Sequence, residues 1–317
     1  MVTGAPKRLS RIVSLASAMT LGLAAIMPTS TMAAAYASPQ PPASHWITST
    51  NYRYPGNDGK HHAVSWDKYS YMIDDHHLNI WSGEVHYWRL PSPHQWRDVL
   101  QKMKAAGFNA VSFYFFWGYH QSAPDSPFDF SGIRNIDLLL RMAAEEGLYV
   151  IARPGPYINA EISMGGMPAW QTNSSLPLRN AWDNTNWQQQ RAWLHAVNKI
   201  IARHQVTNGG GSVLLYQVEN EELASVGPYA DYVKKIIKAA KEDGINVPIF
   251  HNDYAPVGNW AFTTKDTGLD VYSYDDYPIR FDCSATRHKL QDHNWHIDPA
   301  FRAAHHSPHF IAEAQGG

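Results

Sequence analysis

The strongest constraint on the fold of this chain is an alternation, after residue 78, of short apolar segments with longer amphipathic ones. The short segments are rich in β-branched and aromatic residues and are bounded by breakers, which is typical of strands. They predict strands at 78–86, 110–116, 148–153, 213–218, 247–251, 270–274 and 309–312. The longer segments predict helices at 93–106, 135–146, 185–204 and 228–243. Strands that alternate with helices pair in parallel.

Two parallel architectures compete for this pattern. A doubly wound sheet needs a glycine-rich phosphate-binding loop after an early strand, and the sequence has none. We therefore expect an α/β fold of the (β/α)8 TIM barrel type, which places catalytic residues at the C-terminal ends of its strands. Because we count only seven strands before Gly317, we expect the barrel to be truncated after the seventh strand.

Composition and charge exclude several classes of protein. Hydrophobic residues make up 44% of the chain and charged residues 17%, which excludes a disordered or collagen-like chain. The net charge is −2 without a basic run beyond the N-terminus, so we expect no nucleic-acid partner. One Cys and 17 His without metal-ligand spacing predict no metal and no other cofactor. The 12 Trp, 17 Tyr and 11 Phe favour sugar binding, because aromatic side chains cover the apolar faces of sugar rings.

The N-terminus has the layout of a signal peptide. Three basic residues, at positions 7, 8 and 11, precede an apolar stretch at 12–27 and small residues at 33–37. A membrane anchor needs about 20 continuous apolar residues, and polar residues and Pro28 interrupt this stretch. We expect a signal peptide at 1–37, secretion to the extracellular space, and no membrane contact after cleavage. A lead-in at 38–75 and the barrel at 76–317 would follow.

Carboxylates stand directly after several of the predicted strands. Glu221 follows the fourth strand and Glu313 the seventh, so the two could face each other across the barrel mouth although they are far apart in sequence. Glycoside hydrolysis needs such a pair, with one carboxyl as nucleophile and one as proton donor. The alternative is that both are rim acids paired with Arg or Lys, as surface acids often are.

Ordered motifs cover nearly everything after residue 75. They are 82–86 (SGEVH), 89–91 with Trp96, 102–109, 113–118, 153–161, 165–170, 219–221 (ENE), 251–253 (HND), 277–283 and Glu313. In this order they resemble glycoside hydrolase family 35, the β-galactosidases. The resemblance implies a retaining mechanism on a (β/α)8 barrel, with a β-galactoside oligosaccharide or polysaccharide as the partner.

The resemblance also implies roles for single residues. Glu221, which follows Asn220, would be the acid/base, and Glu313 the nucleophile. Glu313 must then be ionised, whereas Glu221 needs a raised pKa to protonate the leaving oxygen. The galactose hydroxyls would contact Tyr114, Asn159, the backbone of Ala160, Glu161, Asn220 and Tyr277.

Several of these residues have a structural alternative. Tyr114 lies in an aromatic run and could belong to the core, and Tyr274 could take the place of Tyr277. Glu161 could be a rim acid paired with Arg153. Glu219 would face away from Asn220 if the strand continued, so we expect it to be structural.

Family members continue through an eighth strand and several β-rich domains. The resemblance therefore implies that this chain is the N-terminal catalytic portion of a longer enzyme, and that Cys283 has its disulfide partner beyond Gly317. We expect the 317 residues alone to fold poorly, because the first and seventh strands would lack partners. The expected function is that of a secreted β-galactosidase acting on terminal non-reducing β-D-galactosyl residues. The alternative is a non-catalytic carbohydrate-binding or degenerate barrel.

Overall fold

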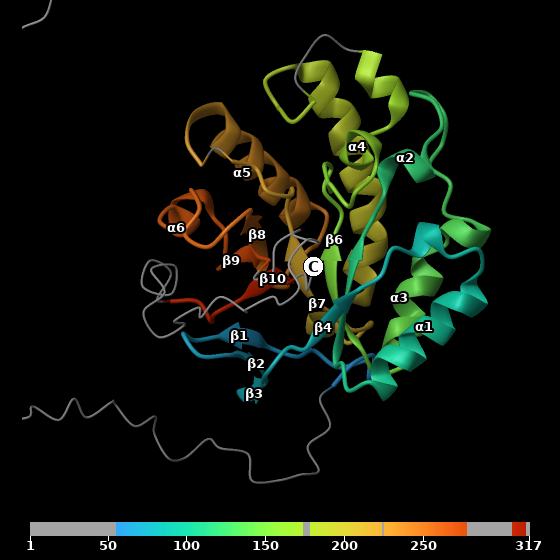
Figure 1. Ribbon diagram of the computed structural model, residues 1–317, viewed down its shortest axis with the longest axis vertical. Coiled ribbons are helices and arrows are strands. Elements are labelled where there is room, and N and C mark those ends of the chain that lie inside the picture. The colour runs from blue at the N-terminus through green and yellow to red at the C-terminus, as the bar shows by residue number, and fades with distance from the viewer. Residues whose placement is uncertain (1–54, 174–177, 224, 278–305, 315–317) are drawn as a thin grey trace, which may run out of the picture. The chain divides into compact units, whose positions relative to one another are not determined.

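A seven-stranded parallel sheet organises the residues that the computed structural model describes, which are 55–173, 178–223, 225–277 and 306–314. Across the sheet the strands follow their order in the chain, from β4 at one edge to β10 at the other. A doubly wound sheet would reverse this order at a switch point, so the curved sheet in Figure 1 has the winding of a barrel. The strands are β4 (Ser82–Glu84), β5 (Ala110–Tyr114), β6 (Tyr149–Arg153), β7 (Val213–Gln217), β8 (Ile249–Asp253), β9 (Val271–Asp276) and β10 (Ile311–Ala314).

The predicted helices lie on the outside of this sheet (Figure 1). The side chains of Asn135 and Asp183 cap two of them by accepting hydrogen bonds from the backbone N–H three residues later, at 2.9 and 2.7 Å. Gly107 and Gly147, which follow the ends of two helices, have φ of +94° and +69°, as a left-handed C-terminal cap requires. The helices are α1 (Pro93–Ala105), α3 (Ile136–Glu145), α4 (Asn184–Ile201) and α5 (Gly227–Glu242), with the short α2 (Trp117–His120) and α6 (Thr264–Thr267).

Side chains alternate between the two faces of each strand and so build two cores. On β6, Val150 and Ala152 belong to the core shared with the helices, whereas Tyr149 and Ile151 belong to the interior core. The same alternation turns the last residue of β6, Arg153, toward the interior. At the C-terminal ends of the strands the interior positions are polar: Tyr114, Arg153, Gln217, Asn252, Asp275 and Glu313.

A small antiparallel sheet precedes the barrel and was not predicted from the sequence. It consists of β1 (Val64–Trp66), β2 (Tyr71–Ile73) and β3 (His76–Leu78). Three of its side chains pack into the interior core, namely those of Tyr71, Ile73 and Leu78. The sheet crosses the boundary expected at residue 75.

The single strand predicted at 78–86 is wrong in part, because the chain changes sheets within it. Leu78 ends β3, and the barrel strand β4 begins at Ser82. The side chain of Asn109 fixes the crossing by accepting from the N–H of Trp81 and donating to the carbonyl oxygen of Asn79, both at 2.7 Å. The apolar pattern continues through the crossing because Leu78 and Ile80 both pack into the interior core.

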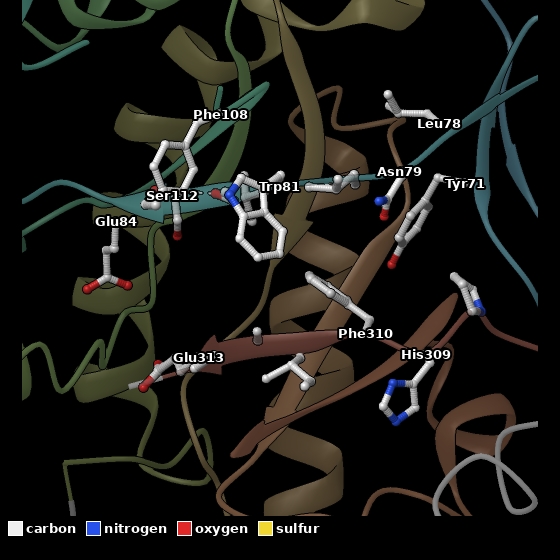
Figure 2. A pocket seen from close by; sticks show the side chains of 18 of the residues that line it. Tyr71, Leu78, Asn79, Trp81, Glu84, Phe108, Ser112, His309, Phe310 and Glu313 are labelled. Carbon is white, nitrogen blue, oxygen red and sulfur yellow. Dashed lines mark hydrogen bonds between the residues drawn. The ribbon is translucent and has the colours of Figure 1, made fainter. Parts of the chain in front are cut away.

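Among the described strands, β4 and β10 form the two edges of the sheet, so the prediction of a barrel truncated after the seventh strand is confirmed. Among the described residues, β4 pairs only with β5, and β10 only with β9. A cavity of about 870 Å³ lies between these two edges. Figure 2 shows Trp81, Phe108 and Phe310 along it, with the carboxylates of Glu84 and Glu313 at one end.

Four expectations concern features other than the barrel. The predicted signal peptide at 1–37 and Cys283 lie outside the described residues. Among the described helices, none is both long and apolar enough to cross a membrane. Within the same residues no group of three or more His, Cys, Asp or Glu side chains could hold a metal ion.

Candidate active site

The predicted nucleophile, Glu313, lies on β10 beside Asp275 of β9. Its Oε2 accepts from the hydroxyl of Tyr277 at 2.6 Å, and its Oε1 accepts from Nη2 of Arg153 at 2.5 Å and contacts the hydroxyl of Tyr114. Burial alone would raise the pKa of Glu313, but the charge of Arg153 and these hydrogen bonds outweigh burial and hold the pKa below its ordinary value. The carboxylate is therefore kept ionised, which is the form that attacks as a nucleophile.

Arg153, at the end of β6, connects the charged groups of the site. It is 1% exposed, donates from Nη1 to Glu84 at 2.8 Å and from Nε to Gln217 at 2.6 Å, and its guanidinium lies 3.9 Å from the ring centroid of Tyr114. A buried guanidinium is tolerated when its donors are paired in this way. The alternative that Arg153 pairs with Glu161 is wrong, because its carboxylate partners are Glu84 and Glu313.

The predicted acid/base, Glu221, follows β7 on a turn. Its Oε2 accepts from Nδ2 of Asn220 at 3.2 Å, and Oδ1 of Asn220 accepts from Nη2 of Arg153 at 3.0 Å. Burial raises the pKa of Glu221, and the negative charge of Glu313 raises it further. The pKa values of the two carboxyls are therefore shifted in opposite directions, downward for Glu313 and upward for Glu221, as a nucleophile and an acid catalyst require.

The three predicted sugar-binding residues of the loop after β6 share an unusual backbone. Asn159, Ala160 and Glu161 have φ of 54°, 54° and 47°. The carbonyl oxygen of Ala160 accepts from Nη2 of Arg89 at 3.0 Å, and Nδ2 of Asn159 donates to Oε2 of Glu221 at 3.4 Å. This turn presents three consecutive residues to the cavity, which Tyr114, Tyr277 and Glu313 also line.

The structure decides between the alternatives for the two tyrosines. Tyr114 is buried, yet its hydroxyl lies 2.9 Å from Oδ1 of Asn220 and also contacts Glu313, so it belongs to the site as well as to the core. The hydroxyl of Tyr277 donates to Glu313, whereas that of Tyr274 contacts His309. All eight predicted site residues thus lie on the cavity or are bonded to residues that line it, and their contacts with a sugar remain predictions.

Sequence reasoning gave no role to two buried residues between the catalytic candidates. Nδ2 of Asn252 donates to Asp275 at 2.7 Å and lies 3.5 Å from Oε1 of Glu313, while its Oδ1 lies 3.3 Å from the backbone N of Glu221. Burial and the charge of Glu313 raise the pKa of Asp275 well above its ordinary value. The sequence could have indicated them through the strand period of two, which places the side chains of Asn252 and Asp275 on the interior face of the sheet.

Comparison with known proteins decides the family. The family model described as glycosyl hydrolases family 35 matches residues 70–317. The chain belongs to glycosyl hydrolase family 35. The resemblance inferred from the sequence motifs is therefore confirmed, and the strands that carry Glu221 and Glu313 lie within the matched family 35 region.

Curated relatives agree with this family 35 membership. "Probable beta-galactosidase C" of Aspergillus clavatus is 40% identical over 268 residues, which cover 82% of this chain and 27% of the relative. The protein of the same name from Aspergillus fumigatus is 39% identical over 273 residues, with 82% and 27% covered. The family 35 chain therefore spans about a quarter of the length of these relatives.

A solved structure supports the fold alone. The exo-beta-1,4-mannosidase from Opitutaceae bacterium strain TAV5 superposes with a TM-score of 0.50 at 15% sequence identity, covering 64% of this chain and 39% of that one. At this identity the similarity concerns the barrel architecture and not the substrate.

Proposed function

We propose that this family 35 chain carries the catalytic site of a retaining β-galactosidase, which hydrolyses terminal non-reducing β-D-galactosyl residues. The observation that supports it best is that the surroundings of the two carboxyls shift their pKa values in opposite directions. Arg153, Tyr114 and Tyr277 keep Glu313 ionised, while burial and the charge of Glu313 favour the proton on Glu221. The names of the curated relatives support galactose as the sugar.

The first half of the reaction transfers the sugar to the enzyme. The ionised Glu313 attacks the anomeric carbon, the glycosidic C–O bond breaks, and Glu221 gives its proton to the leaving oxygen. The glycosyl ester neutralises Glu313 and so removes one of the charges that raised the pKa of Glu221. Glu221 is then an ionised base in the intermediate.

The second half returns the enzyme to its starting state. Glu221 removes a proton from water, the water oxygen attacks the anomeric carbon, and the ester bond to Glu313 breaks. Arg153 and Tyr277 stabilise the negative charge that returns to Glu313, because they already donate to its two oxygens. Two displacements at the same carbon retain its configuration.

Galactose is distinguished from glucose by its axial 4-hydroxyl group. We assign the recognition of sugar hydroxyls to Asn159, Glu161 and Tyr277, which line the cavity with their polar side chains. A site built to bond one hydroxyl orientation leaves its own buried polar groups unpaired when the epimer binds. We expect β-galactosides to be preferred over β-glucosides by at least about a hundredfold in kcat/KM.

Turnover of matched aryl glycosides tests this proposal. The enzyme expressed from the full reading frame that contains these residues is assayed with a nitrophenyl β-galactoside and the corresponding β-glucoside. Comparable kcat/KM values would reject galactose specificity. Binding of galactosides without any turnover would favour the non-catalytic carbohydrate-binding alternative.

We also propose that the protein is exported, on the basis of its N-terminal sequence. The basic, apolar and small-residue regions of 1–37 follow one another in the order of a signal peptide. N-terminal sequencing of the protein recovered from the culture medium is expected to begin near residue 38. Retention of the intact N-terminus inside the cell would contradict export.

A further inference from the structure

A second arginine lies beside the acid/base turn and has no part in the mechanism described above. Nε and Nη2 of Arg179 donate to the two carboxylate oxygens of Glu219 at 2.7 and 2.5 Å. Nη2 also donates to the backbone carbonyl oxygen of Asn220 at 2.6 Å. Since Glu219 is 1% exposed, one guanidinium holds both a buried side chain and the backbone of the turn that carries Glu221.

The turn itself needs to be held. Glu219 and Glu221 have φ of 58° and 49°, a left-handed conformation that costs free energy in residues other than glycine and persists only where the surroundings fix it. Nε2 of Gln217 donates to the carbonyl oxygen of Glu219 at 2.8 Å, and Oδ1 of Asn252 accepts from the N–H of Glu221 at 3.3 Å. Arg179 adds a two-pronged ionic contact to these single hydrogen bonds.

Arg179 is in turn held in place by α4. Nε2 of Gln190 donates to the carbonyl oxygens of Leu178 and Asn180, on either side of Arg179, at 2.9 and 3.2 Å. The guanidinium also lies 4.1 Å from the ring centroid of Tyr157, in the loop after β6. The backbone and the charged group of Arg179 are therefore both fixed before any substrate binds.

We propose that Arg179 is a positioning residue for general acid catalysis: it ties the Glu219–Glu221 turn to α4 and thereby keeps the carboxyl of Glu221 where it can protonate the leaving oxygen. The inference rests on the proposed function, because it takes Glu221 as the proton donor. Burial raises the pKa of Glu219 to about 7 although Arg179 opposes this shift, so without Arg179 the Glu219 carboxyl takes up a proton and loses its forked contact, and the carbonyl oxygen of Asn220 loses its donor. Both changes allow the turn to relax.

A matched pair of variants separates this role from general stabilisation. Arg191 makes the same kind of two-pronged contact with Asp243, at 2.8 and 2.9 Å, and its side chain is 27% exposed against 26% for Arg179. Arg191 and Asp243 join α4 to the end of α5, and within the described part of the chain neither has a hydrogen bond to the turn after β7. R179Q and R191Q each remove a forked ion pair, with different connections to the site, and Asp243 keeps donors from His195 and Asn198 when Arg191 is replaced.

The experiment compares substrates that differ in their need for an acid. In the enzyme from the full reading frame, R179Q is expected to lower kcat/KM for an alkyl β-galactoside by about tenfold to a hundredfold, but for a dinitrophenyl β-galactoside by less than about threefold, because a good leaving group needs little proton assistance. R191Q is expected to change kcat/KM for both substrates by the same small factor. R179K keeps the charge but not the forked geometry, so we expect it to fall between R179Q and the parent enzyme.

Thermal unfolding of each variant shows whether the fold survives, and R179K provides the milder test should R179Q unfold. Two results would overturn the role of Arg179 while leaving the proposed function intact. One is an equal loss of kcat/KM on the two substrates in R179Q and R179K. The other is a larger loss on the alkyl than on the dinitrophenyl galactoside in R191Q as well. Failure of the parent enzyme to cleave either galactoside would overturn the proposed function and this inference with it.

Discussion

Glu221 follows β7, a strand that pairs with β6 on one side and β8 on the other, whereas Glu313 lies on β10, which pairs only with β9 among the described strands. The position of Glu221 depends on a turn whose backbone is bonded to Asn252 and Arg179. The carboxylate of Glu313 depends instead on side chains from β5, β6 and the residue after β9.

This difference shows how one barrel supports two carboxyls with opposite tasks. A carboxyl that must keep its proton can lie buried beside a negative charge, as Glu221 does, with only amide donors in direct contact among the described cations and amides. A carboxyl that must stay ionised needs strong donors on both oxygens, and Arg153 and Tyr277 supply them to Glu313. The edge position of β10 makes these side-chain contacts the main restraint on the nucleophile.

The largest effect is expected from exchanging each carboxyl for an amide in the enzyme from the full reading frame. E313Q removes the nucleophile, so turnover of every galactoside should fall to background. E221Q removes only the proton donor and should still release dinitrophenol rapidly from a dinitrophenyl β-galactoside. Steady-state and burst kinetics on both variants check this. Retained turnover by E313Q would show that Glu313 is not the nucleophile.

A smaller effect is expected from the side chains that hold Glu313. Y277F deletes the hydroxyl that donates to Oε2, and a hydrogen bond to a charged group contributes about 1.5 to 3 kcal/mol, or about tenfold to a hundredfold in kcat/KM. Y274F is the matched control, because that hydroxyl contacts His309. Equal losses in the two variants would show that Tyr277 does not restrain the nucleophile.

The pH profile sharpens the comparison further. As pH falls through the lowered pKa of Glu313, the nucleophile is protonated and kcat/KM is lost; as pH rises through the raised pKa of Glu221, the proton donor is lost. In the parent enzyme the alkaline limb should therefore be pronounced with an alkyl β-galactoside and weak with a dinitrophenyl β-galactoside, whereas the acid limb should be present with both. An equally strong alkaline limb with both substrates would assign that limb to a group other than Glu221.

The smallest effect concerns the backbone of the two strands in the 317-residue chain, measured on its folded monomeric fraction because the chain alone is expected to fold poorly. Amides of β10, which pairs on one side, should exchange with solvent faster than those of β7, which pairs on both. Hydrogen exchange followed by mass spectrometry of peptides that cover 213–217 and 311–314 measures the difference. Equal protection would mean that another part of the chain covers the outer edge of β10.

The barrel could be predicted from the sequence because its strands and helices have different periods, and strand β5 and helix α3 lie within two residues of their predicted bounds at every end. The antiparallel sheet was missed because its three strands have only three residues each. The break between Leu78 and Ser82 was missed because Ile80 and Trp81, which lie within it, are apolar and continue the pattern of Leu78. The hydrophobic pattern of a sequence indicates which residues are buried, but it does not indicate to which of two sheets they belong.

The catalytic candidates could be predicted because they end apolar runs, but their partners could not. Arg153 was considered as a partner of Glu161, whereas it bonds Glu84 and Glu313. Arg179 lies 40 residues from the Glu219 carboxylate that it holds, and no local pattern connects the two. Contacts of this kind depend on how the chain curves around the barrel, so they emerge only from the three-dimensional arrangement.

The most direct test of the account is to identify the residue that becomes covalently bound to the sugar. A 2-fluoro-galactoside with a good leaving group slows the second displacement, so the glycosyl-enzyme accumulates and can be digested and sequenced by mass spectrometry. The label is predicted on Glu313, in the peptide that contains β10. A label on Glu221, or no label on either carboxyl in an enzyme that turns over galactosides, would contradict the assignment.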